Sequence, residues 1–151
     1  MLKSMKKGIR ILGISDGHSK TVTTQSLGIV GVVFRGAYWL EGVMKTIIER
    51  DGLNSTSQLV RMIRSSPHFQ QIRVIITDGL AFGDLNIINI KVLLEKIGIP
   101  VISVSRRREL ISLNERIKGL DRYSWRRRAL KAAGQAVTLQ LTPEKRPLHL
   151  H

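Results

Sequence analysis

The sequence predicts an α/β fold in which helices pack against a mixed β-sheet. Two observations lead to this class. The first part of the chain holds three consecutive apolar runs separated by turn residues, which is typical of antiparallel strands. Beyond residue 50, segments with helical periodicity alternate with further apolar runs, which is typical of βαβ units and parallel strands. A chain of 151 residues has the usual length of one domain, so we expect a single domain over residues 1–151.

The first three strands are expected at residues 9–14, 27–34 and 38–49. The first run ends in Ser15-Asp16-Gly17, whose small and polar residues favour a turn. The second run, LGIVGVVF, is rich in β-branched residues, which suit a pleated surface. Arg35-Gly36-Ala37 can then turn the chain back into the third strand. These three strands should therefore form an antiparallel meander.

A helix is expected after residues 51–56, whose polar residues can close the third strand and cap a helix. Its apolar face consists of Leu59, Val60, Met62 and Ile63. The helix should end before Pro67, because proline disfavours helical backbone in the residue that precedes it. The run at residues 72–77 is continuously apolar, which indicates a strand buried on both faces of a parallel sheet.

The second helix is expected at residues 86–97, with Gly98 at its carboxyl end, and the next strand at residues 99–104. The predicted order up to this point is β-β-β-α-β-α-β. The composition then changes: residues 106–131 hold ten Lys and Arg against three Asp and Glu, which is +7 of the net charge of +14. Helical periodicity continues at 110–117 and 125–133, and a short last strand is expected at 137–141.

The charge balance points to an anionic partner. The chain has 25 Lys and Arg against 11 Asp and Glu, and such a field attracts nucleic acid or an anionic membrane surface. The absence of cysteine excludes disulfides, thiolate zinc sites and a cysteine nucleophile, and it fits a reducing cytoplasm. No apolar run approaches the ~18 residues of a membrane span, and the basic N-terminus is not followed by a signal-peptide core. We therefore expect a cytoplasmic protein that binds nucleic acid and does not insert into a membrane. Its oligomeric state stays open.

The predicted order of elements, with acidic turns after the first and fourth strands, resembles the ribonuclease H-like fold. In that fold these two strands lie side by side, and an acid at the end of each holds a divalent metal ion. The segments ILGISDG, GVVFRGAYWLEGV, DGLNST and SSPHFQQIRVIITDGLAFGDLNIINI resemble domain-of-unknown-function family 99. That family is archaeal, uncharacterised and related to endonuclease V. The resemblance covers about residues 8–105, and residues 106–151 should add basic helices and a short strand.

The resemblance implies that Asp16 and Asp78 hold a magnesium or manganese ion and that Asp51 joins them as a catalytic carboxylate. Two-metal cleavage of a phosphodiester needs carboxylates that converge on the ions, and magnesium takes one or two protein carboxylates. The residues alone also allow a plainer interpretation. Asp-Gly pairs are common in turns that end strands, and this alternative is the stronger one for Asp51.

The chain departs from the family pattern at the most important position. Ser15 stands where the resemblance implies the first acid, and Asn54 and Asn89 stand where further acids are expected. Because side chains alternate across a strand, Asp16 should face away from the site. A serine hydroxyl is neutral and replaces a carboxylate ligand poorly. The resemblance therefore implies a metal-dependent endonuclease whose metal site is degraded.

Four histidines are candidates for proton transfer or metal binding. His18 follows the first acidic turn, and His68 lies in a loop after Pro67, where surface packing is the alternative. His149 and His151 alternate near the C-terminus and could chelate a metal. A frayed tail is the stronger interpretation of these last two.

Two arginine runs are predicted to contact phosphates, because arginine forms charge-assisted hydrogen bonds with them. They are Arg106, Arg107 and Arg108 after the last core strand, and Arg126, Arg127 and Arg128 in the second basic helix. Trp125 beside the second run could stack on an unpaired base. The alternative is a solvated helix face with Trp125 packed into the core.

Three functions are consistent with this sequence. The first is a metal-dependent endonuclease, favoured by Asp78 and the fold resemblance. The second is a nucleic-acid-binding module with a degraded metal site, favoured by Ser15, Asn54 and Asn89. The third is a protein–protein scaffold, which no feature of the sequence favours directly. We expect a nucleic-acid-associated protein on a ribonuclease H-like core, and its catalytic activity stays open.

Overall fold

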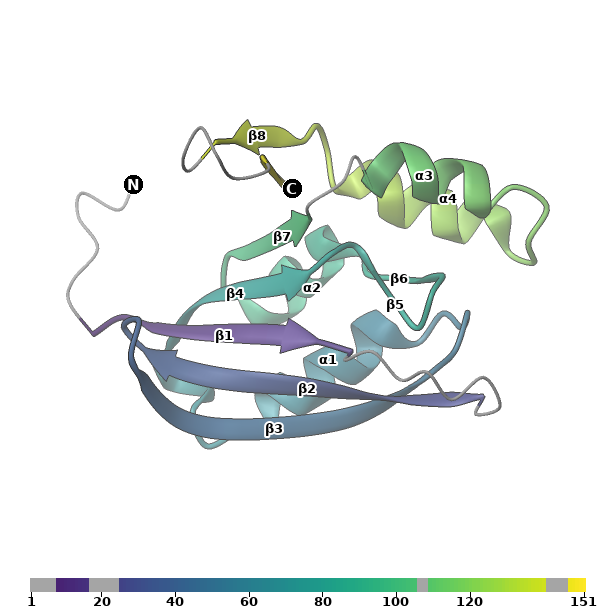
Figure 1. Ribbon diagram of the computed structural model, residues 1–151. Coiled ribbons are helices and arrows are strands. Elements are labelled where there is room, and N and C mark those ends of the chain that lie inside the picture. The colour runs from purple at the N-terminus through teal and green to yellow at the C-terminus, as the bar shows by residue number, and fades with distance from the viewer. Residues whose placement is uncertain (1–7, 17–24, 106–108, 141–146) are drawn as a thin grey trace.

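The computed structural model describes residues 8–16, 25–105, 109–140 and 147–151, and contains a seven-stranded sheet in the order β3-β2-β1-β4-β7-β9-β8 (Figure 1). The strands of this sheet are β1 (Arg10–Ser15), β2 (Ser26–Arg35), β3 (Trp39–Glu49), β4 (Ile72–Asp78), β7 (Val101–Ser105), β8 (Val137–Leu139) and β9 (Leu148–Leu150). A small hairpin is formed by β5 (Ala81–Phe82) and β6 (Asn86–Ile87). The helices are α1 (Ser55–Arg64), α2 (Ile90–Ile97), α3 (Glu109–Arg116) and α4 (Tyr123–Ala132), with a 3₁₀ turn at Phe69–Gln71.

The strand pairing confirms the predicted mixed sheet. β1, β2 and β3 form the antiparallel meander, and β1 also pairs in parallel with β4, which pairs in parallel with β7. The first and fourth strands are therefore neighbours, as expected. Parallel neighbours end at the same edge of a sheet, so the residues that follow β1, β4 and β7 meet there.

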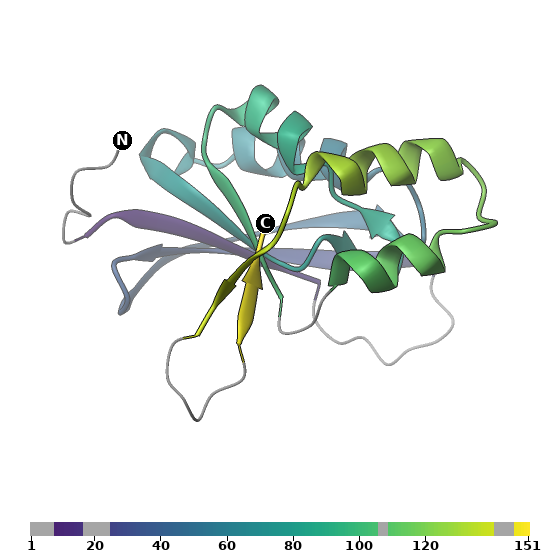
Figure 2. The ribbon, with the colours of Figure 1, turned by 90° about the horizontal axis from the view of Figure 1, so that it is seen from above.

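The core lies between one face of the sheet and helices α1 and α2. Alternate residues of β2 are buried, as expected for a strand with one covered face. The apolar faces of the helices bury Leu59 and Ile63 of α1 and Leu93 of α2. Helix α1 packs on β3 and α2 on β7, and both views place these helices on one side of the sheet (Figures 1 and 2). The opposite face remains available for a site.

The second predicted helix was placed four residues too early. Asn86 begins strand β6, and α2 starts only at Ile90. Asn86 is fully buried and donates to the Glu49 carbonyl at 2.8 Å, while its side-chain oxygen accepts from the Ser55 amide at 3.0 Å. Asn89 caps α2 by accepting from the Val92 amide at 3.1 Å. The side-chain bonds of Asn86 thus hold it outside the helix, and the cap at Asn89 fixes where α2 begins.

The C-terminal tail is not frayed, which corrects a second expectation. Strand β9, which contains His149, lies between β7 and β8 and is antiparallel to both. His151 and Ser103 exchange two backbone hydrogen bonds of 2.9 Å. Three residues carry too little periodicity to indicate a strand, so only long-range pairing with β7 could reveal it. In the part of the chain that the structure describes, no helix has both the length and the apolar character needed to cross a membrane.

Candidate functional site

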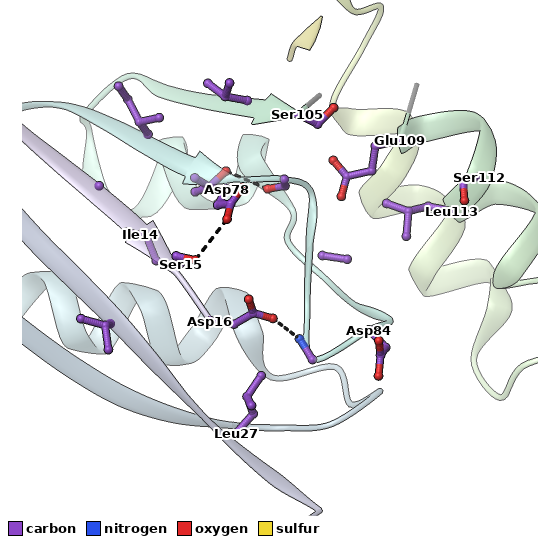
Figure 3. Close-up of a pocket in the computed structure, with 18 of the residues that line it drawn as sticks. Ile14, Ser15, Asp16, Leu27, Asp78, Asp84, Ser105, Glu109, Ser112 and Leu113 are labelled. Atoms are coloured by element: carbon purple, nitrogen blue, oxygen red, sulfur yellow. Dashed lines mark hydrogen bonds between the residues drawn. The ribbon is translucent and has the colours of Figure 1, made fainter. Parts of the chain in front are cut away.

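A cleft of about 1340 Å³ opens at the carboxyl ends of β1, β4 and β7. Its floor includes Gly13, Val32 and Ile76, which are partners in register across three neighbouring strands. These residues alternate with the buried core residues, so they belong to the face opposite α1 and α2. Helix α3 forms one wall, and the β5–β6 hairpin borders the other side (Figure 3). The cleft therefore lies where the sequence predicted a site.

Asp78 and Ser15 face each other in this cleft. The Ser15 hydroxyl donates a hydrogen bond of 3.2 Å to a carboxylate oxygen of Asp78 (Figure 3). The register explains the contact, because Ile14 and Thr77, the preceding residues, are partners in the parallel β1–β4 pair. Serine thus occupies the place beside Asp78 at which the family resemblance implied an acid.

Asp16 also lines the cleft, but its carboxylate points to a different partner. One of its oxygens accepts a hydrogen bond of 2.9 Å from the Gly83 amide, which ties the end of β1 to the β5–β6 hairpin (Figure 3). Strand alternation led us to expect that Asp16 faces away from the site; it lines the same cleft as Ser15 but has a different partner. Asp16 is therefore near the site without being a copy of the missing acid.

The structure does not bring Asp51 to the cleft. Its carboxylate accepts a hydrogen bond of 2.9 Å from the Leu85 amide, and its backbone has a positive φ of 52°. The Asp51 carboxylate therefore stabilises a turn, which was the stronger alternative from the sequence. Asn54 is likewise structural, because its side-chain oxygen accepts from the Glu49 amide at 3.1 Å and from Asn86 at 2.9 Å.

Glu109 is a cleft residue that the sequence analysis missed. Both of its carboxylate oxygens lie 3.1 Å from the Leu80 amide, which donates to them. Burial raises the pKa of the Glu109 carboxyl above its ordinary value, and the charge of Asp78 adds to this increase while the bond from Leu80 opposes it. The only local signal was an acid at the start of a helix that follows a strand. Glu109 is thus a third carboxyl group of the site, held by the turn after β4.

Gly79 makes room for Glu109. A Cβ atom on Gly79 would lie 2.6 Å from a carboxylate oxygen of Glu109, and Gly79 has a φ of +85°. The left-handed backbone favours glycine here, and any larger residue would also push the Glu109 carboxylate out of its place. The Asp78-Gly79 pair is therefore a turn that also shapes the cleft.

The described residues do not fit a two-metal centre. Among residues 8–16, 25–105, 109–140 and 147–151, no three His, Asp or Glu side chains lie close enough together to hold a metal ion. The carboxylates of Asp16, Asp78 and Glu109 are each oriented by a different donor: Gly83, Ser15 and Leu80. His18 falls outside the described residues. His68 lies at the other end of the sheet, where its ring occupies the space beside Gly42.

Arg126 corrects the predicted phosphate-binding run. Its exposed fraction is only 6%, and its guanidinium donates to the carbonyls of Asp51, Gly52, Leu85 and Asp121. A buried guanidinium whose donors are taken by backbone oxygens cannot contact an external phosphate. Arg126 therefore fastens α4 to the loops beside the cleft.

The neighbours of Arg126 remain exposed to solvent. Arg127 and Arg128 are exposed, and the Arg128 guanidinium carbon lies 6.0 Å from the centre of the Trp125 ring. Trp125 itself is 63% exposed, so the core alternative for this residue is wrong. Arg106, Arg107 and Arg108 lie outside the described residues.

Comparisons with known proteins identify the family. Residues 7–149 match the family model described as endonuclease dU. The chain belongs to the endonuclease dU family. The match extends well past residue 105, where the sequence resemblance had ended. The family bears a different name from the one that the sequence suggested, but it is the same kind of family.

Archaeal relatives support this membership. The UPF0215 protein of Methanopyrus kandleri is 39% identical over 149 residues, covering 98% of this chain and 75% of the relative. The UPF0215 protein of Methanothermobacter thermautotrophicus is 42% identical over 105 residues, covering 70% of this chain and 52% of the relative. The chain thus matches about half the length of the latter protein and of its Methanosarcina barkeri counterpart.

Two solved structures share the fold of this chain. A protein of unknown function from Archaeoglobus fulgidus aligns with a TM-score of 0.78 at 29% identity, covering 93% of this chain and 77% of that one. Endonuclease V from Streptomyces avermitilis aligns with a TM-score of 0.59 at 12% identity, covering 95% of this chain and 65% of that one. The predicted fold class and its similarity to endonuclease V are therefore confirmed.

Proposed function

We propose that this endonuclease dU family member binds a nucleic-acid strand across the cleft and has little or no Mg²⁺-dependent nuclease activity as this chain stands. The observation that carries the proposal is the hydrogen bond from Ser15 to Asp78. It places a neutral hydroxyl beside Asp78 at the edge of the sheet where the parallel strands end. The site therefore has one negative charge fewer than the family resemblance implies.

Charge and exposure support the binding part of the proposal. The net charge of +14 attracts a phosphate polymer. Trp125, Arg127 and Arg128 present an aromatic ring and two guanidinium groups to solvent on α4. The family name, endonuclease dU, makes a strand that contains deoxyuridine the first ligand to test.

The reduced catalysis follows from the carboxyl groups of the cleft. Divalent metal ions, where nucleases hold them, activate water and stabilise charge on the scissile phosphate. Here Asp16 is oriented by the Gly83 amide, and the raised pKa of Glu109 keeps that carboxyl neutral to a higher pH than a free glutamate. Both features act against the binding of a divalent cation in the cleft.

Fluorescence anisotropy with short labelled oligonucleotides tests the binding part. We expect binding whose affinity falls with salt, because each neutralised phosphate releases counterions. Changing both Arg127→Gln and Arg128→Gln should reduce the slope on duplex DNA by up to about 1.8 units, at about 0.9 per contact. The matched control, Arg61→Gln with Lys96→Gln on α1 and α2, should leave the slope almost unchanged. Binding that is absent at low salt would contradict the proposal.

A cleavage assay on the same strands tests the catalytic part. We expect no product above the protein-free control with Mg²⁺ or Mn²⁺, with or without deoxyuridine. Efficient cleavage that disappears in the Asp78→Asn variant would instead establish a nuclease.

Nuclease activity is the second candidate function, and one observation favours it. Glu109 lies close enough to Asp78 for the charge of Asp78 to raise its pKa. Glu109 is therefore a further carboxyl group near Asp78 in the cleft, and loss of cleavage in Glu109→Gln would assign it a role in the reaction.

A further inference from the structure

Three charged side chains from separate elements meet at the cleft: Arg50 after β3, Asp84 in the β5–β6 turn, and Arg116 at the end of α3. The Arg50 guanidinium lies 3.0 Å from one carboxylate oxygen of Asp84, and the Arg116 guanidinium lies 4.0 Å from the other. We call these three residues the rim triad. One carboxylate is shared by two guanidinium groups, so the triad has a net charge of +1.

The carboxylate is presented on a turn that backbone hydrogen bonds hold. Asp84 has a φ of 69°, in the left-handed region, and it follows Gly83 with a φ of 52°. The carbonyl of Gly83 accepts hydrogen bonds from the Asp51 and Leu85 amides, each 3.0 Å long. Backbone hydrogen bonds thus tie the turn to the 50–52 segment beside it, in addition to the ion pairs of Asp84.

Both arginines remain accessible. The side chain of Arg116 is 49% exposed and that of Arg50 is 26% exposed, while Asp84 itself is 56% exposed. Exposed ion pairs are weak, usually below about 1 kcal/mol. An anion that binds the two arginines more tightly than Asp84 does can therefore displace Asp84 without unfolding the protein.

We propose that Arg50 and Arg116 form a phosphate-binding site for the strand in the cleft, and that Asp84 occupies this site as an internal competitor when no strand is bound. This inference rests on the proposed function, since it names the residues that hold the backbone. The two Asp84 oxygens contact different arginines. The two guanidinium groups are therefore spaced to share an anion that has two terminal oxygens. A phosphodiester group offers the same pair of oxygens and one negative charge, and arginine binds such groups through charge-assisted hydrogen bonds.

The position of the rim triad suits a strand that passes over the carboxyl groups of the cleft. Asp78 and Glu109 inside the cleft oppose the close approach of phosphate, whereas the rim triad attracts it. The backbone would therefore be held at the rim while a nucleotide reaches inward. In this arrangement Arg50 and Arg116 hold the backbone, although neither belongs to one of the two arginine runs.

The test compares three variants in the anisotropy assay with an unmodified single strand. Asp84→Asn should raise the affinity by about three- to fivefold at moderate salt, because it removes the competitor. Asparagine tolerates a left-handed backbone, so the turn should persist. Arg50→Gln and Arg116→Gln should each lower the affinity and reduce the salt slope by about 0.7 on a single strand.

Matched controls separate the rim triad from general charge effects. Glu95→Gln on α2 removes an exposed acid, and Arg73→Gln at the start of β4 removes an exposed base; both should change the affinity little. In the Arg50→Gln, Arg116→Gln background, Asp84→Asn should give no gain, as expected for coupled residues. Thermal melting of each variant shows whether a loss of affinity comes from unfolding. Unfolding cannot produce a gain in affinity.

The outcomes are distinct. If the wild-type chain binds, but Asp84→Asn behaves like Glu95→Gln, the inference is wrong and the proposed function stands. If Asp84→Asn gains affinity equally with and without the two arginines, the carboxylate acts only through general repulsion, and the inference is also overturned. If the wild-type chain does not bind at low salt, the proposed function fails and the inference fails with it.

Discussion

Replacing Arg126 by alanine is expected to lower the Tm by about 10 °C, at roughly 2–4 °C per kcal/mol for a protein of this size. The four carbonyl groups that now accept hydrogen bonds from its guanidinium belong to Asp51, Gly52, Leu85 and Asp121. A carbonyl that is shielded from water and left without a donor costs about 1–3 kcal/mol. Gly52 and Leu85 are half-buried, whereas Asp51 and Asp121 are exposed, so water can replace part of the lost bonds. A net loss of about 3–5 kcal/mol is comparable to breaking a buried ion pair.

Thermal denaturation followed by circular dichroism measures this effect. Arg127→Ala is the matched control, because its neighbouring side chain is exposed and such substitutions usually change stability by less than about 0.5 kcal/mol. Arg126→Lys should be intermediate, since lysine keeps the charge but has fewer donors. An Arg126→Ala protein that melts with the wild type would show that the guanidinium does not hold the loops.

Replacing Ser15 by aspartate is expected to strengthen Mn²⁺ binding by about tenfold, because additional ligand charge increases the affinity of oxygen sites for divalent cations. The new carboxylate would stand where the Ser15 hydroxyl now meets Asp78. Two adjacent carboxylates repel each other, and a divalent cation relieves this repulsion. The substitution therefore restores the charge that the family resemblance implies.

Isothermal titration calorimetry with Mn²⁺ alone tests this expectation. Ser15→Asn is the control, because it has a similar shape to aspartate without the charge. Addition of Asp78→Ala to the Ser15→Asp protein should abolish the gain. Equal Mn²⁺ affinity in the aspartate and asparagine variants would mean that Ser15 is not at a metal position.

The sheet was predictable because its signals are local. The runs that became β1 to β4 and β7 are rich in β-branched residues. Ser15 and Asp16 have different hydrogen-bond partners, although both line the cleft. The order of elements predicted the pairing of β1 with β4. This pairing places Ser15 and Asp78, which end the two strands, beside each other.

The residues that were missed depend on contacts between distant segments. Arg126 stands in a run of three arginines that resembles a solvated face, and only folding brings the carbonyls of residues 51, 52 and 85 to it. Glu109 becomes part of the cleft because α3 returns over the turn at Gly79. Strand β9 is three residues long and obtains its register from β7 and β8. None of these features has a periodic signature in the sequence.

Site-directed crosslinking tests the central claim, that a nucleic-acid strand lies in the cleft. The chain contains no cysteine, so a single introduced thiol carries a photoreactive group at one known position. Ser112→Cys places it on the α3 wall of the cleft, and Gln70→Cys places it on an exposed turn at the amino end of β4. We expect ultraviolet irradiation with a labelled strand to give a crosslinked product from the position 112 variant and only background from the position 70 variant. Equal yields at the two positions, or a higher yield at position 70, would contradict binding in the cleft.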